Sequence, residues 1–264
     1  MITIWTGPVN FAQLGPYVTV GDGKISVPCT GDGSPSCADL AEGFLAPDGT
    51  RLASLLASRG VPSDESVAVG AFSAGGSLAK RLCLSSFDRA QIRVLYCADA
   101  MYTTDRGVGG GPAPIDGFVL YAVDAIVGAS DKIFVATASA SPNKAFGSGI
   151  EVMRATRAEI ERRVGQSFSE VPTLPGSPVA PSWAGRLGDV WFAEYEDVPH
   201  GEHATQLAGP IWRDLIRPSV VGVPVAVAAS SESSAGTWVA VGLGVVAGWG
   251  VASAFRPRHR RPRR

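Results

Sequence analysis

Two kinds of segment alternate through residues 1–219: short apolar runs typical of strands, and stretches whose apolar side chains recur at helical spacing. The expected strands are residues 1–5, 66–72, 92–98, 132–138 and 190–195, and the expected helices are residues 50–59, 75–84, 117–127, 150–164 and 204–216. Because parallel strands need long crossover connections, usually helices, this order predicts an α/β domain with a mostly parallel sheet and helices on both faces. Residues 166–188, rich in proline and glycine, are expected to form a loop.

The formal net charge of −1 conceals an uneven distribution of charged residues. Residues 256–264 hold six arginines and no acidic side chain, so the rest of the chain carries 17 basic against 24 acidic groups. Such a mildly acidic body lacks the broad basic face that nucleic-acid binding requires. We therefore expect no nucleic-acid partner for the main domain.

Residues 220–236, which end in the small, polar sequence ASSESSAG, are expected to link this domain to an uncharged, apolar stretch at residues 237–255. As a helix these 19 residues would extend about 28 Å, close to the hydrocarbon thickness of a bilayer of about 30 Å. Trp238 and Phe255 lie near its two ends, where aromatic rings favour the membrane interface. The pattern predicts one C-terminal transmembrane helix; the alternative is a buried glycine-rich helix or an unstructured tail.

Within this segment Gly244 and Gly248 form a GxxxG pair, which permits the close approach of a second helix and hence self-association. Residues 237–264 as a whole are expected to contact membrane lipid, with the arginines at the anionic surface. A further hypothesis is that this tail carries the main role of the chain, by association within membranes or by binding anionic lipid.

The arginines after the apolar segment predict a cytoplasmic C-terminus and therefore a domain on the opposite side of the membrane. The first residues, MITIWTGPVNF, show no secretory signal pattern. These two observations point in different directions, so the sequence leaves open which side a single-pass, C-terminally anchored domain faces.

Four cysteines are too few for a disulfide scaffold in a chain of 264 residues. Cys29 and Cys37 flank a turn-rich loop and are able to pair in an oxidising compartment, a point that the sequence leaves open. Cys83 and Cys97 lie in apolar stretches and are expected to be buried thiols.

The segment SVAVGAFSAGGSLAKRL places Ser73 between an expected buried strand and an expected helix. Ala71 and Gly75, two residues before and after it, are small enough for the sharp turn of a nucleophile elbow, which exposes the serine hydroxyl. The N–H of Ala74, at the start of the helix, would then face a developing oxyanion. The alternative is an ordinary strand-to-helix turn, in which small residues also fit.

A nucleophilic serine needs a base, and two of the three histidines, His200 and His203, lie between the last expected strand and the last expected helix. His203 adjoins the helix and is the first candidate, and His200 is the second; His259, in the arginine-rich tail, is a poor one. The alternative is that these histidines only cap the helix. The group His200, Glu202 and His203 also suggests a metal, but HGEH fits no zinc-protease spacing, so no metal ligand is assigned.

Asp99 ends the strand that follows the expected nucleophile helix, and it therefore lies at the same edge of the sheet as Ser73. The next strand supplies no carboxylate, so Asp99 is the candidate acid that orients the histidine. Asp197 and Glu202 are weaker candidates for the acid. Alternatively, Asp99 is only a turn aspartate whose side chain accepts hydrogen bonds from nearby backbone N–H groups.

The order Ser73, Asp99, His203 over alternating strands and helices resembles the α/β-hydrolase superfamily across residues 1–219. The chain departs from the family because its acid follows the first strand after the nucleophile and because it lacks an HGGG-type oxyanion loop, for which the Gly7–Pro8 turn is a substitute candidate. The resemblance implies acyl transfer to serine and hydrolysis of an ester, thioester or amide, without a metal or organic cofactor. Two hypotheses follow: a membrane-anchored esterase or lipase-like enzyme acting on an acyl ester, or a non-catalytic membrane-anchored or assembly protein on a hydrolase-like fold.

Overall fold

The computed structural model describes residues 1–8, 14, 18–21, 23–29, 35–103, 105–107, 110–128, 131–141 and 148–221. The chain divides into two units, Met1–Ser230 and Ser231–Arg264, and every described residue belongs to the first. The predicted transmembrane segment 237–255 and the basic tail lie outside the described residues. Of the helices that are described, none has the length and apolar character needed to cross a bilayer.

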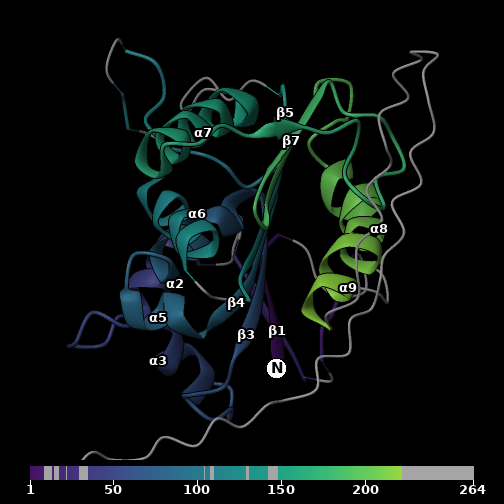
Figure 1. Cartoon of the computed structure of the whole chain (residues 1–264). Coiled ribbons are helices and arrows are strands. Elements are labelled where there is room, and N and C mark those ends of the chain that lie inside the picture. The colour runs from purple at the N-terminus through teal and green to yellow at the C-terminus, as the bar shows by residue number, and fades with distance from the viewer. Residues whose placement is uncertain are drawn as a thin grey trace, which may run out of the picture. The chain divides into compact units, whose positions relative to one another are not determined.

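An eight-stranded sheet forms the centre of the first unit, with the strand order β2-β1-β3-β4-β5-β8-β7-β6 (Figure 1). Its strands are β1 (Ile2–Gly7), β2 (Gly23–Pro28), β3 (Val67–Phe72), β4 (Ile92–Ala98), β5 (Ile133–Ser139), β6 (Ser169–Glu170), β7 (Trp183–Leu187) and β8 (Val190–Tyr195). Neighbouring strands from β2 to β8 pair in parallel, and β7 and β6 add an antiparallel edge. This confirms the α/β class with a mostly parallel sheet.

Part of the segment expected to be a loop is instead β structure. β7 pairs with β8 through a tight turn at Gly188, which has a φ of 59°, and β6 pairs with β7. β7 is short and contains Gly185, and several prolines precede it, so its sequence carries little strand signal. Trp183 covers Gly185, which restores the packing that the glycine lacks.

Helices cover both faces of the sheet (Figure 1). On one face lie α2 (Cys37–Gly43), α3 (Leu52–Ala57), α4 (Gly76–Leu82), α5 (Ser86–Gln91), α6 (Asp116–Val127) and α7 (Gly149–Val164). The other face is covered by a continuous C-terminal helical segment made of η2 (His203–Leu207), α8 (Ala208–Ile211), η3 (Trp212–Ile216) and α9 (Arg217–Val220). The parts η2 and η3 have the wider π-helical turn, and each lies next to a helical proline, Pro210 or Pro218, that cannot donate a backbone hydrogen bond.

Each face of the sheet has its own apolar core, as β4 illustrates. Leu95 and Cys97 belong to the core under α2–α7, whereas Val94 and Tyr96 belong to the core under the C-terminal helical segment. Strands buried on both faces need apolar residues at successive positions, which is why residues 94–98 of β4 form an apolar run rather than an alternating pattern. The free thiols of Cys83 and Cys97 are buried, as expected.

Cys29 and Cys37 form a disulfide that joins the end of β2 to the start of α2. Cys29 is fully buried, and its sulfur lies 3.4 Å from the hydroxyl of Thr6 on β1. Its backbone N–H also donates to the carbonyl of Gly7, at the end of β1. The disulfide therefore lies at the C-terminal edge of the parallel strands.

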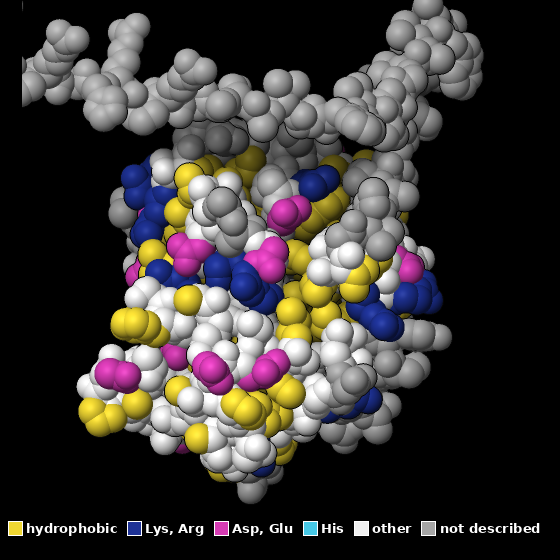
Figure 2. All heavy atoms as spheres, turned by 60° about the horizontal axis from the view of Figure 1, so that its bottom comes forward, with side chains coloured by type: hydrophobic (Ala, Val, Ile, Leu, Met, Phe, Trp, Pro, Cys, Tyr) yellow, Lys and Arg dark blue, Asp and Glu magenta, His cyan; other side chains and the backbone are white. Residues whose placement is uncertain are grey.

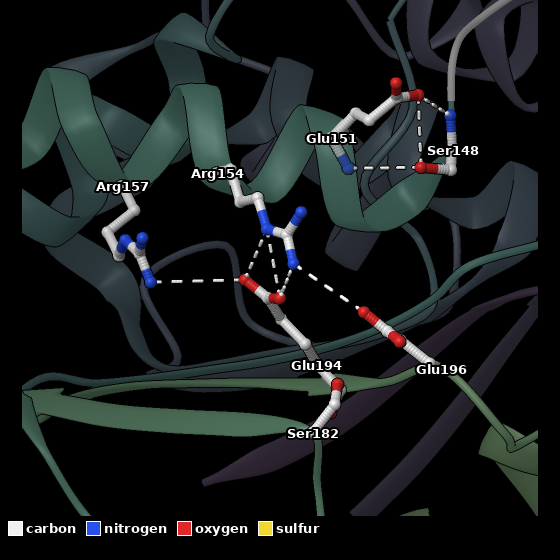
Figure 3. Close-up of polar contacts among 7 residues, drawn as sticks. All are labelled: Ser148, Glu151, Arg154, Arg157, Ser182, Glu194 and Glu196. Atoms are coloured by element: carbon white, nitrogen blue, oxygen red, sulfur yellow. Dashed lines mark hydrogen bonds and ion pairs between the residues drawn. The ribbon is translucent and has the colours of Figure 1, made fainter.

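An ion pair between a buried carboxylate and a half-exposed guanidinium fixes the end of β8 to α7 (Figure 3). The carboxylate of Glu194, only 2% exposed, accepts two hydrogen bonds of 3.0 Å from Nε of Arg154 and a further one from its Nη2. Arg157, one turn further along α7, approaches the same carboxylate to 4.0 Å. A capping box between Ser148 and Glu151 begins this helix. The chain thus leaves β8 toward residue 200 from an anchored position.

Figure 2 shows the surface at the N-terminal ends of the parallel strands, where β1 begins. On the described part of this face, acidic and basic side chains are interspersed with patches of apolar ones, and no extended patch of a single charge forms. The polar cluster described next lies at the C-terminal edge of the strands, where ligands of open parallel sheets bind.

Candidate active site

Ser73 follows the last residue of β3 and has a positive φ of 52°. It begins the short 3₁₀ turn η1 (Ser73–Gly75), which leads directly into α4. A non-glycine residue in the left-handed region costs energy and is uncommon. The chain therefore turns sharply at Ser73, as a nucleophile elbow requires.

Glycines allow this turn because other backbone lies against them. A Cβ at Gly75 would overlap the carbonyl oxygen of Thr6, and one at Gly76 would overlap the carbonyl oxygen of Ala100. The close approach thus brings together the ends of β1, β3 and β4. Small residues after Ser73 are needed for packing as well as for the turn itself.

The N–H of Ala74 lies in the first helical turn after Ser73, where backbone N–H groups have no partner within the helix. This is the position expected for an oxyanion donor. The second expected donor was the Gly7–Pro8 turn; Gly7 has a φ of 125° and lies against the carbonyl of Phe72. Pro8 has no N–H, and the residue after it, Val9, lies outside the described residues.

Asp99 follows β4, the neighbour of β3, and also has a positive φ, of 43°. Its carboxylate is fully buried and accepts hydrogen bonds from the backbone N–H of Ser139, at 3.0 Å, and from the Ser139 hydroxyl. Burial opposes ionisation, but the hydrogen bonds from His200 and Ser139, together with the nearby His203, hold the pKa of Asp99 below its usual value. Asp99 is therefore an ionised acceptor in the interior.

His200 joins Asp99 to Ser73. Its Nδ1 lies 2.7 Å from Oδ2 of Asp99, and its Nε2 lies 2.9 Å from Oγ of Ser73. One face of the imidazole stacks on the Phe72 ring, with ring centroids 4.9 Å apart and an interplanar angle of 21°. The imidazole is 34% exposed, so His200 lies at the surface of the domain and is in contact with solvent.

His203, the first candidate for the base, lies elsewhere. Its ring is fully buried under the C-terminal helical segment, and its Nδ1 faces the hydroxyl of Thr137 at 3.3 Å. Burial lowers the pKa of His203, against the opposing effect of the Asp99 carboxylate. The order of the two candidates is therefore reversed: the ring of His200, in the turn before η2, points to Ser73, and that of His203, the first residue of η2, points into the core.

The weaker candidates for the acid, Asp197 and Glu202, gain no support from the described part of the structure. Among the contacts of the described residues, no hydrogen bond or ion pair joins the carboxylate of Asp197 or of Glu202 to either histidine ring. The described residues also contain no group of three side chains suited to hold a metal ion, because His200 and His203 diverge.

Three residues of the site were not predicted from the sequence. Ser139 donates a hydrogen bond to Asp99, Phe72 stacks on the face of the His200 ring, and the hydroxyl of Tyr102 lies 3.1 Å from Nδ1 of His200. Ser139 had a usable signal, because it ends β5, the strand beside β4. Between β4 and α6, an isolated β-bridge joins Arg106 to Pro112.

Together these contacts form a chain of hydrogen bonds in which each group has a chemical part. The Nδ1 of His200 lies against an ionised carboxylate, so it carries the proton, and the lone pair of Nε2 faces the Ser73 hydroxyl. A hydroxyl in this position can lose its proton to Nε2 as its oxygen attacks an electrophile.

Comparison of the chain with protein-family models, with curated proteins and with solved structures gives no match.

Proposed function

We propose that the chain is a serine hydrolase of α/β-hydrolase-like fold that cleaves an ester, thioester or amide through an acyl-enzyme. The observation that carries the proposal is the hydrogen-bonded series Ser73–His200–Asp99 at the C-terminal edge of the sheet. The strand–turn–helix setting of Ser73 and the buried, ionised acid support it, because a catalytic triad uses both features.

In this mechanism Ser73 attacks the carbonyl carbon of the substrate while Nε2 of His200 accepts its proton. The resulting imidazolium is stabilised by Asp99, which the Ser139 donors hold in place. The N–H of Ala74 donates to the oxyanion of the tetrahedral intermediate. His200 then returns the proton to the leaving group, and a water molecule, activated in the same way, hydrolyses the acyl-Ser73 ester. The chemistry needs no metal or organic cofactor.

The sequence adds a membrane role to the proposal. The apolar segment 237–255 is proposed to be a single-pass anchor, with helix association through Gly244 and Gly248. The Cys29–Cys37 disulfide favours an oxidising compartment for the domain, and the arginines favour a cytoplasmic C-terminus. Both favour a domain on the non-cytoplasmic side, where a lipid or envelope ester is the proposed substrate class.

The test is labelling of the full-length chain in detergent with a fluorophosphonate probe. Ser73→Ala should abolish labelling, and His200→Ala should slow it by about 10²–10⁴-fold, the usual contribution of a general base. Ser77→Ala, which removes a half-buried serine four residues away, is the matched control and should label normally. His203→Gln should also label at close to the wild-type rate, provided that circular dichroism shows it to be folded.

A folded wild type that the probe does not label would contradict the proposal and favour a non-catalytic membrane-anchored protein. Loss of labelling in His203→Gln but not in His200→Ala would contradict the assignment of the base. Protection of the domain from external protease in sealed cells or spheroplasts would overturn the proposed topology alone.

A further inference from the structure

Tyr102 lies beside the proton-bearing nitrogen of His200, in a position that the triad chemistry alone does not explain. Its hydroxyl oxygen is 3.1 Å from Nδ1, the atom that also lies 2.7 Å from Oδ2 of Asp99. The edge of its ring faces the imidazole, with ring centroids 6.0 Å apart and an interplanar angle of 68°. Tyr102 therefore contacts His200 through both its hydroxyl and its ring.

The roles of the two hydrogen-bond partners of Nδ1 follow from their charges. An unprotonated Nδ1 at 2.7 Å from an ionised carboxylate would place two acceptors against each other, so Nδ1 carries the hydrogen. The Tyr102 oxygen then serves as a second acceptor for the same N–H. Burial, then the charge of the Asp99 carboxylate and then a hydrogen bond to that carboxylate raise the pKa of the Tyr102 hydroxyl, so it stays neutral and its own O–H is directed to Asp99.

The chain brings Tyr102 to this place by a short, anchored path. Asp99 and Tyr102 are separated only by Ala100 and Met101, both of which are buried, and the carbonyl of Ala100 packs on Gly76. On the far side of Tyr102, the hydroxyl of Thr103 accepts a hydrogen bond of 3.1 Å from the N–H of Asp105. The segment that supplies the acid thus also supplies a fixed second contact to His200.

The imidazole is held from two directions. Phe72, the residue before Ser73, stacks on its face, and Tyr102, three residues after Asp99, meets it edge-on. Both are favoured aromatic arrangements. Rotation of the ring would break its contacts with Tyr102 and Asp99. A shift of the proton from Nδ1 to Nε2 would place bare Nδ1 against the Asp99 carboxylate, and Tyr102 would keep its hydrogen bond only by turning its O–H from Asp99 to Nδ1.

We propose that Tyr102 is a positioning residue that holds His200 as the Nδ1–H tautomer, with the lone pair of Nε2 directed at Ser73. The proposal rests on the function proposed above, since it assigns how the base of that reaction is kept ready. Tyr102 is not assigned a contact with substrate.

The experiment compares Tyr102→Phe with Tyr195→Phe in the full-length chain in detergent micelles. Tyr195→Phe is the matched control, because it removes a hydroxyl that donates to Ser177, 2.8 Å away, and does not contact His200. Two quantities are measured: the rate of fluorophosphonate labelling, resolved into probe binding and chemical step, and the ¹⁵N resonances of the histidine rings. The resonances are assigned with His→Gln variants, and they report which ring nitrogen is protonated.

Tyr102→Phe should slow the chemical step by up to about tenfold, the equivalent of one net hydrogen bond, with probe binding unchanged. It should also lower the Nδ1–H population of His200, whereas Tyr195→Phe should change neither. A wild-type tautomer and a wild-type chemical step in Tyr102→Phe would overturn the proposal. If the wild type is not labelled at all, the proposed function fails, and the ring resonances alone decide whether Tyr102 sets the tautomer of His200.

Discussion

Ser73 and Asp99 leave two neighbouring parallel strands in the same left-handed backbone conformation, with φ angles of 52° and 43°. Each such non-glycine residue costs about 1–3 kcal/mol, so surrounding structure must compensate for both. Here the compensation comes from close backbone packing around Gly75 and Gly76 and from the hydrogen bonds between Ser139 and Asp99. The backbone conformation of their own strands therefore determines where the nucleophile and the acid of the proposed triad lie, without a contribution from the histidine.

Gly75→Ala tests this packing. Its Cβ would overlap the carbonyl of Thr6, so the elbow must shift, and the free energy of unfolding should fall by about 2 kcal/mol or more. Urea denaturation measures the loss, and labelling of Ser73 should fall with it. Gly43→Ala is the control, because nothing lies within 4 Å of the added Cβ and stability should hardly change. Equal stability of the two variants would contradict the packing argument.

The Cys29–Cys37 disulfide closes a short loop, with a sequence separation of 8. The loss of chain entropy in the unfolded state predicts that the double variant Cys29→Ser with Cys37→Ser loses about 2.5 kcal/mol of stability. Denaturant unfolding with and without a reductant measures it. The reductant should destabilise the wild type and leave the double variant unaffected; a wild type insensitive to reductant would show that the disulfide does not form.

The ion pair of Arg154 and Glu194 should respond unequally to the loss of either partner. Glu194 is 2% exposed and Arg154 is 51% exposed, so Arg154→Met leaves a buried charge, whereas Glu194→Gln leaves a solvated one. We expect Arg154→Met to lower the free energy of unfolding by about 2 kcal/mol and Glu194→Gln to lower it less. Arg162→Met, which breaks an exposed pair with Glu159, should cost within about 0.5 kcal/mol. The reverse order for the first two variants would refute the burial argument.

The buried His203 should make stability depend on pH. Burial lowers its pKa in the folded state, so below about pH 6.5 the unfolded chain binds a proton that the folded chain resists. The contribution of His203 is therefore complete above pH 6.5 and is lost as the pH falls toward the folded pKa. Asp99, whose pKa is also lowered, adds a separate loss only below its unfolded value of 3.8.

Unfolding free energies of wild type and His203→Gln, measured from about pH 7.5 to about pH 4.5, isolate the histidine. The difference between them should shrink on acidification, because the variant lacks the titrating group. A constant difference across this range would mean that His203 does not resist protonation in the folded state.

The sequence indicated the sheet well where strands are buried on both faces. β3, β4, β5 and β8 are mostly apolar segments between helices, with only a few polar residues such as Arg93 and Glu194, and their positions and parallel arrangement were predictable. The edge strands were not. β2 has alternating exposed residues and follows a turn-rich segment, and β7 contains Gly185, against which the side chains of Trp183 and Phe168 pack.

At the candidate site, Ser73 and Asp99 were predictable because the end of a parallel strand determines the edge at which a side chain lies. The choice between His200 and His203 was not. Both lie in one turn that includes Gly201, and the direction of each ring depends on the next contact: Thr137 for His203, and Phe72 with Asp99 for His200. His203 begins η2 and is buried together with Ala204 and Leu207 of the same segment.

The order of the three groups along the chain has a consequence for biosynthesis. Two of them, Ser73 and Asp99, belong to the first half of the chain, whereas His200 arrives after β8 has completed the parallel part of the sheet. Under the proposed mechanism, a nascent or truncated chain that ends before His200 would carry a serine without its base. Acylation of Ser73 would then report that the two ends of the domain have come together, and in a chain split between α7 and β7 it would signal reassembly of the fragments.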